Sequence, residues 1–239
     1  MKKLVTLLIT LAIGVFPMFA YAQETKETVV LKPTPDTDKI FTKVIRTVVS
    51  NDEDIIRIEG NAGSNPEGYK ISIDEENGTY TATRLPDKQI EAILLESQEV
   101  SPMASHYRSV TAITDDPAGV DLAKHTHRLN FTTGSGKATY SSRTKSAWAA
   151  NPSSLGTHWY VDENVYTGLG YLDGNRTVYS SSRAKFHNYD FGDDSTVTRV
   201  THYITIEGYY TGGSNYYVDW SRSGEGWNLL DLDIVTSSN

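Results

Sequence analysis

The segment TVYSSSRAKFHNYDFGDDSTVTRVTHYITIEGYYTGGSNYYVDW, residues 177–220, decides the fold of this chain. It lies within a longer stretch, Trp148 to Trp227, where 16 of the chain's 25 aromatic residues are concentrated. Runs rich in Tyr, Thr, Val and Ile alternate there with Gly, Asn and Asp. β-Branched and aromatic residues favour strands, and the small polar residues favour tight turns. The stretch therefore predicts antiparallel strands joined by hairpins.

The same pattern extends outward over residues 106–239, where short strand candidates are separated by turn signals. The predicted strands are 108–113, 125–131, 139–140, 159–161, 177–179, 185–191, 198–207, 215–220 and 229–235. In the last of them Leu230, Leu232 and Ile234 alternate with Asp231 and Asp233, which is the period of a half-buried strand. The protein is thus predicted to be mainly β, with an aromatic-rich antiparallel β-sandwich, or barrel-like, region over residues 106–239.

Residues 23–100 predict a small α+β region. Apolar residues at helical spacing predict a helix over residues 40–49, and Pro86 and Asp87 introduce a second over 86–94. Residues 55–58 predict a strand, and 69–73 and 80–83 predict a hairpin with a type I′ turn at Asn77-Gly78. Whether this region is a pro-region or an accessory domain is left open by the sequence.

Residues 1–22 have the pattern of a secretory signal peptide. Lys2 and Lys3 precede an apolar run from Leu4 to Phe19, and Ala20-Tyr21-Ala22 is a small-residue cleavage site. No later stretch is apolar enough for a stable membrane span in the mature chain. The expected product is a secreted, extracellular protein, and the absence of Cys favours a Gram-positive bacterium.

Charge and cysteine usage exclude several function classes. Removing Lys2 and Lys3 with the signal peptide leaves 20 basic and 30 acidic side chains, a net charge of −10. Such a chain repels phosphate backbones, so nucleic acid is not expected as a partner. The absence of Cys excludes disulfides, thiolate metal sites and thiol nucleophiles.

A surplus of rings in the aromatic stretch predicts a binding surface. Consecutive tyrosines on a strand point to opposite faces, so one ring of each pair should face outward. Exposed rigid rings suit the flat apolar faces of sugars or a partner protein. The candidate ligand-binding residues are Trp159, Tyr203, Tyr209, Tyr210, Tyr216 and Tyr217.

Two patterns suggest metal ions, and a simpler interpretation is preferred for each. His125 and His127 share one strand face and could chelate zinc, but this face continues into Leu129 and Phe131, which favours hydrogen-bonded histidines at a core edge. Loops rich in Asp and Asn suit calcium, but the same residues favour turns. These acidic loops are 115–116, 162–164, 173–175 and 190–194. No cofactor is predicted, with calcium left open.

These observations favour a non-catalytic binding module for a glycan or protein partner at the cell surface, and they assign no catalytic residue. The alternative is a secreted hydrolase that uses carboxylates or His, with or without a metal. A third hypothesis is a membrane-active β toxin, because Thr132–Lys145 and Thr177–Lys185 are Ser/Thr-rich and amphipathic.

Overall fold

A computed structural model of the chain describes residues 27–35, 37, 41–50, 52–61, 65–96, 106–151, 158–191 and 197–239. The predicted signal peptide, residues 1–22, lies outside the described residues. So do residues 97–105, which separate the two predicted regions, and the acidic residues Asp193 and Asp194.

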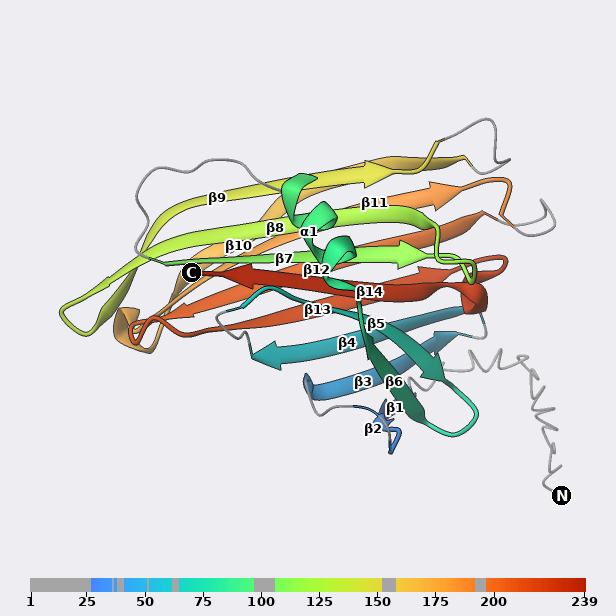
Figure 1. The fold of residues 1–239 in the computed structure, drawn as a ribbon, viewed down its shortest axis with the longest axis horizontal. Coiled ribbons are helices and arrows are strands. Elements are labelled where there is room, and N and C mark those ends of the chain that lie inside the picture. Colours follow the sequence, from blue (N-terminus) through green and yellow to red (C-terminus); the bar gives the residue numbers. More distant parts are fainter. Residues whose placement is uncertain are drawn as a thin grey trace, which may run out of the picture.

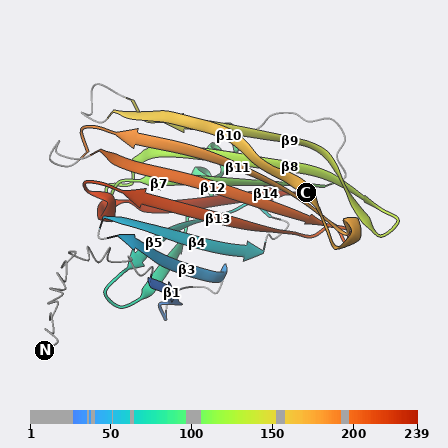
Figure 2. The ribbon, with the colours of Figure 1, turned by 180° about the vertical axis from the view of Figure 1, so that it is seen from behind.

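Two seven-stranded sheets pack face to face as a β-sandwich (Figures 1 and 2), which confirms the predicted fold class. Sheet A has the order β1 (Glu27–Val30), β3 (Phe41–Ser50), β4 (Glu53–Asn61), β13 (Ser214–Ser223), β12 (Thr198–Tyr209), β11 (Thr177–Asn188) and β10 (Trp159–Leu172). Sheet B has the order β2 (Lys32–Pro33), β6 (Thr79–Arg84), β5 (Glu67–Asp74), β14 (Asp231–Ser238), β7 (His106–Asp115), β8 (Asp121–Gly134) and β9 (Lys137–Ala149). Among the described strands, only the short β2 runs parallel to its neighbour, β6.

Strands from both sides of residue 100 contribute to each sheet. β4 pairs with β13 in sheet A, and β5 pairs with β14 in sheet B. The helix α1 (Asp87–Glu96), which the sequence predicted, lies across sheet B, where Ile90 and Ile93 pack with Ile113 and Val235 (Figure 1). Without residues 27–96, β13 and β14 would each lose a hydrogen-bonded neighbour. No helix among the described residues is long and apolar enough to cross a membrane.

The predicted helix over residues 40–49 is wrong, because Phe41–Ser50 forms strand β3. Phe41 lies opposite Gly60 and Lys43 lies opposite Glu59, so Thr42 is an extra residue in a β-bulge. A bulge shifts the inward-facing positions by one. Phe41 and Val44 are therefore both buried although they are three residues apart, and this spacing imitates the period of a helix.

Two further local predictions are corrected. The hairpin of β5 and β6 is confirmed, but Asp74 pairs with Thr79, so the turn has four residues rather than two. The Asp74 carboxylate stabilises this turn by accepting hydrogen bonds from the backbone and side-chain nitrogens of Asn77, at 3.0 and 2.8 Å. The predicted strands 177–179 and 185–191 are one strand, β11, which ends at Asn188.

The core between the sheets is built largely from aromatic and branched side chains, and the largest that are fully buried include Trp159, Trp220, Phe131 and Phe186. Burying each ring removes about 150–250 Å² of surface from water. This aromatic core stabilises a chain that has no disulfide.

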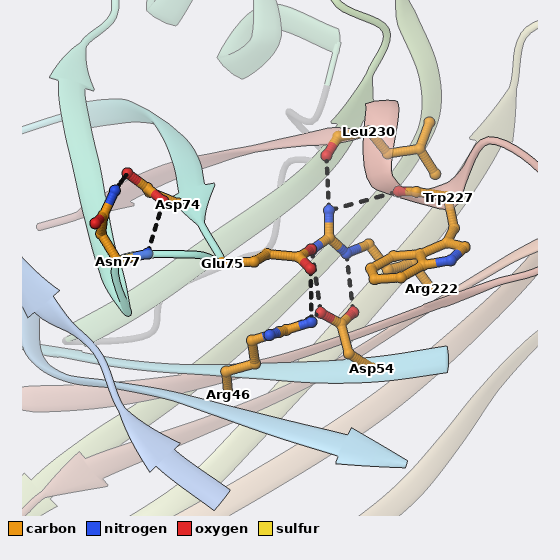
Figure 3. A network of polar contacts seen from close by, with 8 residues as sticks. All are labelled: Arg46, Asp54, Asp74, Glu75, Asn77, Arg222, Trp227 and Leu230. Atoms are coloured by element: carbon orange, nitrogen blue, oxygen red, sulfur yellow. Dashed lines mark hydrogen bonds and ion pairs between the residues drawn. The ribbon is translucent and has the colours of Figure 1, made fainter. Parts of the chain in front are cut away.

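A buried ion network joins the two sheets near one end of the sandwich (Figure 3). Arg222 on β13 donates two hydrogen bonds to Asp54 on β4, at 2.9 and 3.1 Å. Arg46 on β3 donates to Asp54 at 2.9 Å. Glu75, in the β5–β6 turn of sheet B, accepts from Arg46 at 2.8 Å and from Arg222 at 2.9 Å. Two cations and two carboxylates therefore balance one another across the sheets.

Arg222 is held on its remaining sides as well. Its guanidinium lies 4.7 Å from the centres of the rings of both Trp220 and Trp227. It also donates to the carbonyl oxygen of Leu230 at 3.1 Å (Figure 3). Planar stacking and forked donation suit Arg in a buried site better than Lys, so the network fixes the position of β13 relative to the turn before β14.

Candidate functional site

Two of the six aromatic residues predicted to bind a ligand belong to the core. Trp159 is 1% exposed and Tyr216 is 3% exposed. The ring of Tyr216 occupies the space above Gly60, where a Cβ would stand 2.3 Å from ring atoms, so only glycine fits at that position. Because both side chains are buried, they offer no ligand surface, and their assignment to a binding site is corrected.

Three others, Tyr203, Tyr209 and Tyr217, lie partly exposed on the outer face of sheet A. Alternation along the strands explains their position, since side chains on either side of a strand residue point to the opposite face. His202 and Ile204, the neighbours of Tyr203, are fully buried. The prediction that one ring of the pair Tyr216-Tyr217 faces outward is met by Tyr217.

The sixth residue, Tyr210, lines an open depression of about 460 Å³ at one end of the sandwich. We call it the Tyr210 depression, and its lining residues are Asp173, Arg176, Thr177, Tyr209, Tyr210 and Thr211. They come from two neighbouring hairpin ends, the turn η1 (Asp173–Asn175) between β10 and β11 and the turn between β12 and β13. The depression therefore combines two rings with a cation, a carboxylate and two hydroxyls.

Arg176 and Tyr210 form the wall of this depression as a unit. The guanidinium of Arg176 lies 4.3 Å from the centre of the Tyr210 ring and donates a hydrogen bond to its hydroxyl oxygen. The backbone nitrogen of Tyr210 donates to the carbonyl oxygen of Arg176 at 2.8 Å. The two hairpin ends are thereby fixed to each other, and the Tyr210 side chain remains 36% exposed.

A carboxylate organises the rings beside the depression. Glu207 accepts hydrogen bonds from the hydroxyls of Tyr209, at 2.9 Å, and Tyr217, at 3.2 Å. Partial burial, and then the Glu207 carboxylate, raise the pKa of Tyr209 above its usual value. Both phenols thus stay neutral donors at physiological pH, and the rings hold a fixed orientation before any ligand arrives.

His125 and His127, which the sequence analysis weighed as a zinc site and as core histidines, lie inside the sandwich. Both are fully buried, with Nε2 of His125 3.0 Å from the Ser182 hydroxyl and Nε2 of His127 3.1 Å from that of Ser180. Both serines lie in sheet A, so these bonds cross between the sheets. The described residues contain no group of three or more His, Asp or Glu side chains that could hold a metal ion.

His202, which lies in sheet A, makes a third hydrogen bond between the sheets, in this case to a residue of sheet B. Its Nε2 lies 2.7 Å from the Thr114 hydroxyl of sheet B, which also accepts a hydrogen bond from Trp220 Nε1 at 3.0 Å. Burial lowers the pKa of His202 to about 3 and that of His127 to about 4. We call His125, His127 and His202 the histidine layer. It is neutral at pH 7.

The acidic loops singled out for calcium are largely occupied by partners within the chain. Asp115 is buried against Asp233 on sheet B, where burial and the second carboxylate raise its pKa, and Asp116 caps its own turn by accepting from two backbone nitrogens at 2.9 Å. Glu163 pairs with Arg183 and Lys185 at 2.6 and 3.3 Å. Calcium binding stays a prediction.

Two further carboxylates hold histidines at the other end of the outer face of sheet A. Asp162 lies 2.6 Å from Nδ1 of His187, and Asp190 lies 2.6 Å from Nδ1 of His158. The rings of Tyr160 and Tyr189 pack against His187, with centres 5.2 and 4.6 Å from it. Each carboxylate orients its imidazole through Nδ1.

Sequence reasoning missed Arg176, and it missed that Asp173 would lie beside Tyr210. The turn at 173–175 was recognised, and so was the tyrosine pair at 209–210. Their proximity follows from the register of β11 and β12, in which Thr177 lies opposite Tyr209. That register is set by tertiary packing, so no local signal could have joined the two turns.

The chain matches no protein family, no curated protein and no solved structure.

Proposed function

We propose that this protein is an exported, non-catalytic module that binds a glycan in the Tyr210 depression, outside or at the surface of a Gram-positive bacterium. The observation that carries the proposal is the combination of Tyr209, Tyr210, Arg176 and Asp173 in one open depression. Tyrosine rings suit the apolar faces of sugars, and charged side chains on the same wall suit their hydroxyls.

The size of the depression favours a glycan over a protein partner. Small-ligand sites have volumes of roughly 300–1,000 Å³, and about 460 Å³ lies within this range. A stable protein interface needs about 800 Å² from each partner. The orientation of Tyr209 is also fixed in advance by Glu207, which lowers the entropic cost of binding.

A hydrolase is the second candidate, and the pairs His187–Asp162 and His158–Asp190 favour it. A carboxylate on Nδ1 orients an imidazole so that Nε2 can take up a proton, as in general-base catalysis. Asp115 and Asp233 are also a carboxyl pair, but both are almost completely buried and do not reach a substrate. The two candidates differ in whether the bound glycan is cleaved.

A glycan array followed by product analysis tests the proposal. We expect retention of at least one glycan class, with the glycan recovered intact. Tyr210→Ala should weaken binding about tenfold or more, the loss typical of a central aromatic contact. Tyr189→Ala, which removes an exposed ring far from the depression, is the matched control and should bind like the unmodified protein. Cleaved products would support the hydrolase instead, and the absence of any retained glycan would overturn the proposal.

A further inference from the structure

The two sheets end together along one side of the sandwich. β10 is the last strand of sheet A and β9 is the last strand of sheet B, and both figures place them side by side (Figures 1 and 2). We call this side the β9–β10 edge. It runs the length of the molecule, and the Tyr210 depression lies at one of its ends.

The β9–β10 edge carries an unusual amount of exposed apolar surface. Seven of the fifteen large hydrophobic side chains that are exposed in the described chain belong to β10. They are 37–44% exposed and comprise Tyr160, Val161, Val165, Tyr166, Leu169, Tyr171 and Leu172. The pairing with β11 places four of them, Val161, Tyr166, Leu169 and Tyr171, on the face toward sheet B, opposite buried positions of β11. An exposed apolar cluster of this kind marks an interaction site more often than a scatter of single residues does.

This edge is poorly suited to pairing with a strand of another protein. Lys145 Nζ donates to the carbonyl oxygen of Asn164 at 2.6 Å, and Arg143 donates to that of Gly168 at 2.7 Å. These side chains from β9 occupy backbone acceptors of β10. Two irregularities in its pairing with β11, at 161–163 and 166–168, also bend the strand. Bulges and basic side chains on an edge prevent strand addition, so the exposed apolar surface fits a different kind of partner.

The charge of this edge is opposite to that of the whole protein. β9 and β10 together carry three basic and two acidic side chains, whereas the chain has a net charge of −8. Arg143 and Lys145 lie 4.0 and 5.0 Å from the centre of the Tyr166 ring. In the described chain neither is paired with a carboxylate. Positive charge among tyrosines and aliphatic residues suits the boundary between anionic headgroups and acyl chains.

We propose that the β9–β10 edge docks the protein onto an anionic lipid surface without crossing it. Val161, Tyr166, Leu169 and Tyr171, on the face of β10 toward sheet B, enter the headgroup boundary, and Arg143 and Lys145 approach the anionic headgroups. This activity is independent of glycan binding, because the Tyr210 depression uses other side chains.

Sedimentation of the purified protein with phospholipid vesicles tests this proposal. We expect binding to vesicles of mixed phosphatidylcholine and phosphatidylglycerol, weak binding to phosphatidylcholine alone, and release by high salt. Lys145→Gln should lower the partition coefficient about fivefold, the effect of one basic residue near a charged surface. Leu169→Glu should lower it at least as much. Val30→Glu is the matched control, because Val30 is 56% exposed on β1, at the opposite edge of sheet A.

The outcomes separate the alternatives. Retained vesicle binding in Val30→Glu, with loss in Leu169→Glu, supports the proposal. Equal binding to neutral and anionic vesicles, or no binding to either, overturns it. Self-association that Leu169→Glu abolishes, without vesicle binding, would assign the edge to a second copy of the chain and also overturns it. Tyr210→Ala should bind vesicles like the unmodified protein, so a failure of the glycan proposal can be told apart from a failure of the lipid proposal.

Discussion

An Asp54→Ala variant is expected to lose about 3–5 kcal/mol of unfolding free energy, the effect of removing one partner from a buried ion pair. Asp54 is fully buried and accepts hydrogen bonds from both Arg46 and Arg222. Its removal leaves two guanidinium groups with Glu75 as their shared carboxylate. Since Arg222 is 3% exposed, water cannot replace the lost partner. The measurement is urea denaturation of both proteins.

The chain provides a matched control on the same two strands. Arg57 on β4 lies opposite Asp219 on β13 and pairs with it at 2.6 and 2.7 Å, but on the solvent side. Asp219→Ala should therefore cost less than about 1 kcal/mol, as for other exposed pairs. If Asp54→Ala and Asp219→Ala lost similar amounts of unfolding free energy, burial would not determine how much the ion network contributes to stability.

Acidification is expected to weaken the contact between the sheets through the histidine layer. The pKa of His127 falls from 6.5 to about 4 on folding, and that of His202 falls from 6.5 to about 3. Because the pKa in the folded state is lower than in the unfolded state, the stability that each neutral histidine contributes is fully present above about pH 6.5. It is lost as the pH falls toward the pKa of the folded state. Lowering the pH from 6.5 to 4 should therefore reduce the unfolding free energy by about 3 kcal/mol for each of these two histidines. Both together approach the total stability of a typical domain, about 5–15 kcal/mol.

The surroundings of the layer offer an added proton no opposite charge. The charged groups that face His127 are Arg143 and Lys145 on β9, and His125 faces Lys145 and His202. His202 is enclosed by Phe186, Trp220 and Thr114. Each added proton therefore meets like charge or apolar surface, and the hydroxyl contacts between the sheets are expected to break.

The carboxyl pair of Asp115 and Asp233 acts in the opposite direction and must be separated from this effect. Folding raises the pKa of both carboxyl groups. The stability that the pair contributes to the protein is therefore fully present below the ordinary carboxyl pKa of 3.8 and is lost as the pH rises. We therefore expect the loss of unfolding free energy on acidification to be clearest in an Asp115→Asn variant. In the double variant that also carries His202→Gln, this loss should be about 3 kcal/mol smaller. Urea denaturation across this pH range measures both. Folded-state imidazole resonances of His127 and His202 that titrate near pH 6.5 would contradict the account.

Much of the fold follows from local sequence patterns. The alternation in residues 198–207 predicts strand β12 with the correct buried face, and Pro86-Asp87 predicts the start of α1. The alternation in residues 230–234 predicts strand β14, but the half-buried interpretation is wrong, because Asp233 on the other face is 1% exposed. The failure at residues 40–49 has one cause: the bulge at Thr42 changes the period of buried residues. The prediction divided β11 between residues 179 and 185. Ser180 and Ser182 lie in that gap and are buried, with hydrogen bonds to histidines of the other sheet.

The network and the site were less predictable because they depend on pairing between distant strands. A partial signal existed for the network. Asp54 has the same alternation phase as Ile56 and Ile58, and Arg222 has that of Trp220, so both charges were on the buried face of their strands. The same phase places Tyr216 inside and Tyr217 outside. The Tyr210 depression needs the register of β11 against β12, which no local pattern contains.

The most direct test of the account is the response of tyrosine ring resonances to a glycan retained on the array. With ring-labelled tyrosine, we expect the signals of Tyr209 and Tyr210 to shift in proportion to bound glycan, while those of Tyr160 and Tyr189 stay in place. Shifts confined to Tyr160 and Tyr189 would move binding to the histidine–carboxylate end of sheet A and contradict the assignment to the Tyr210 depression.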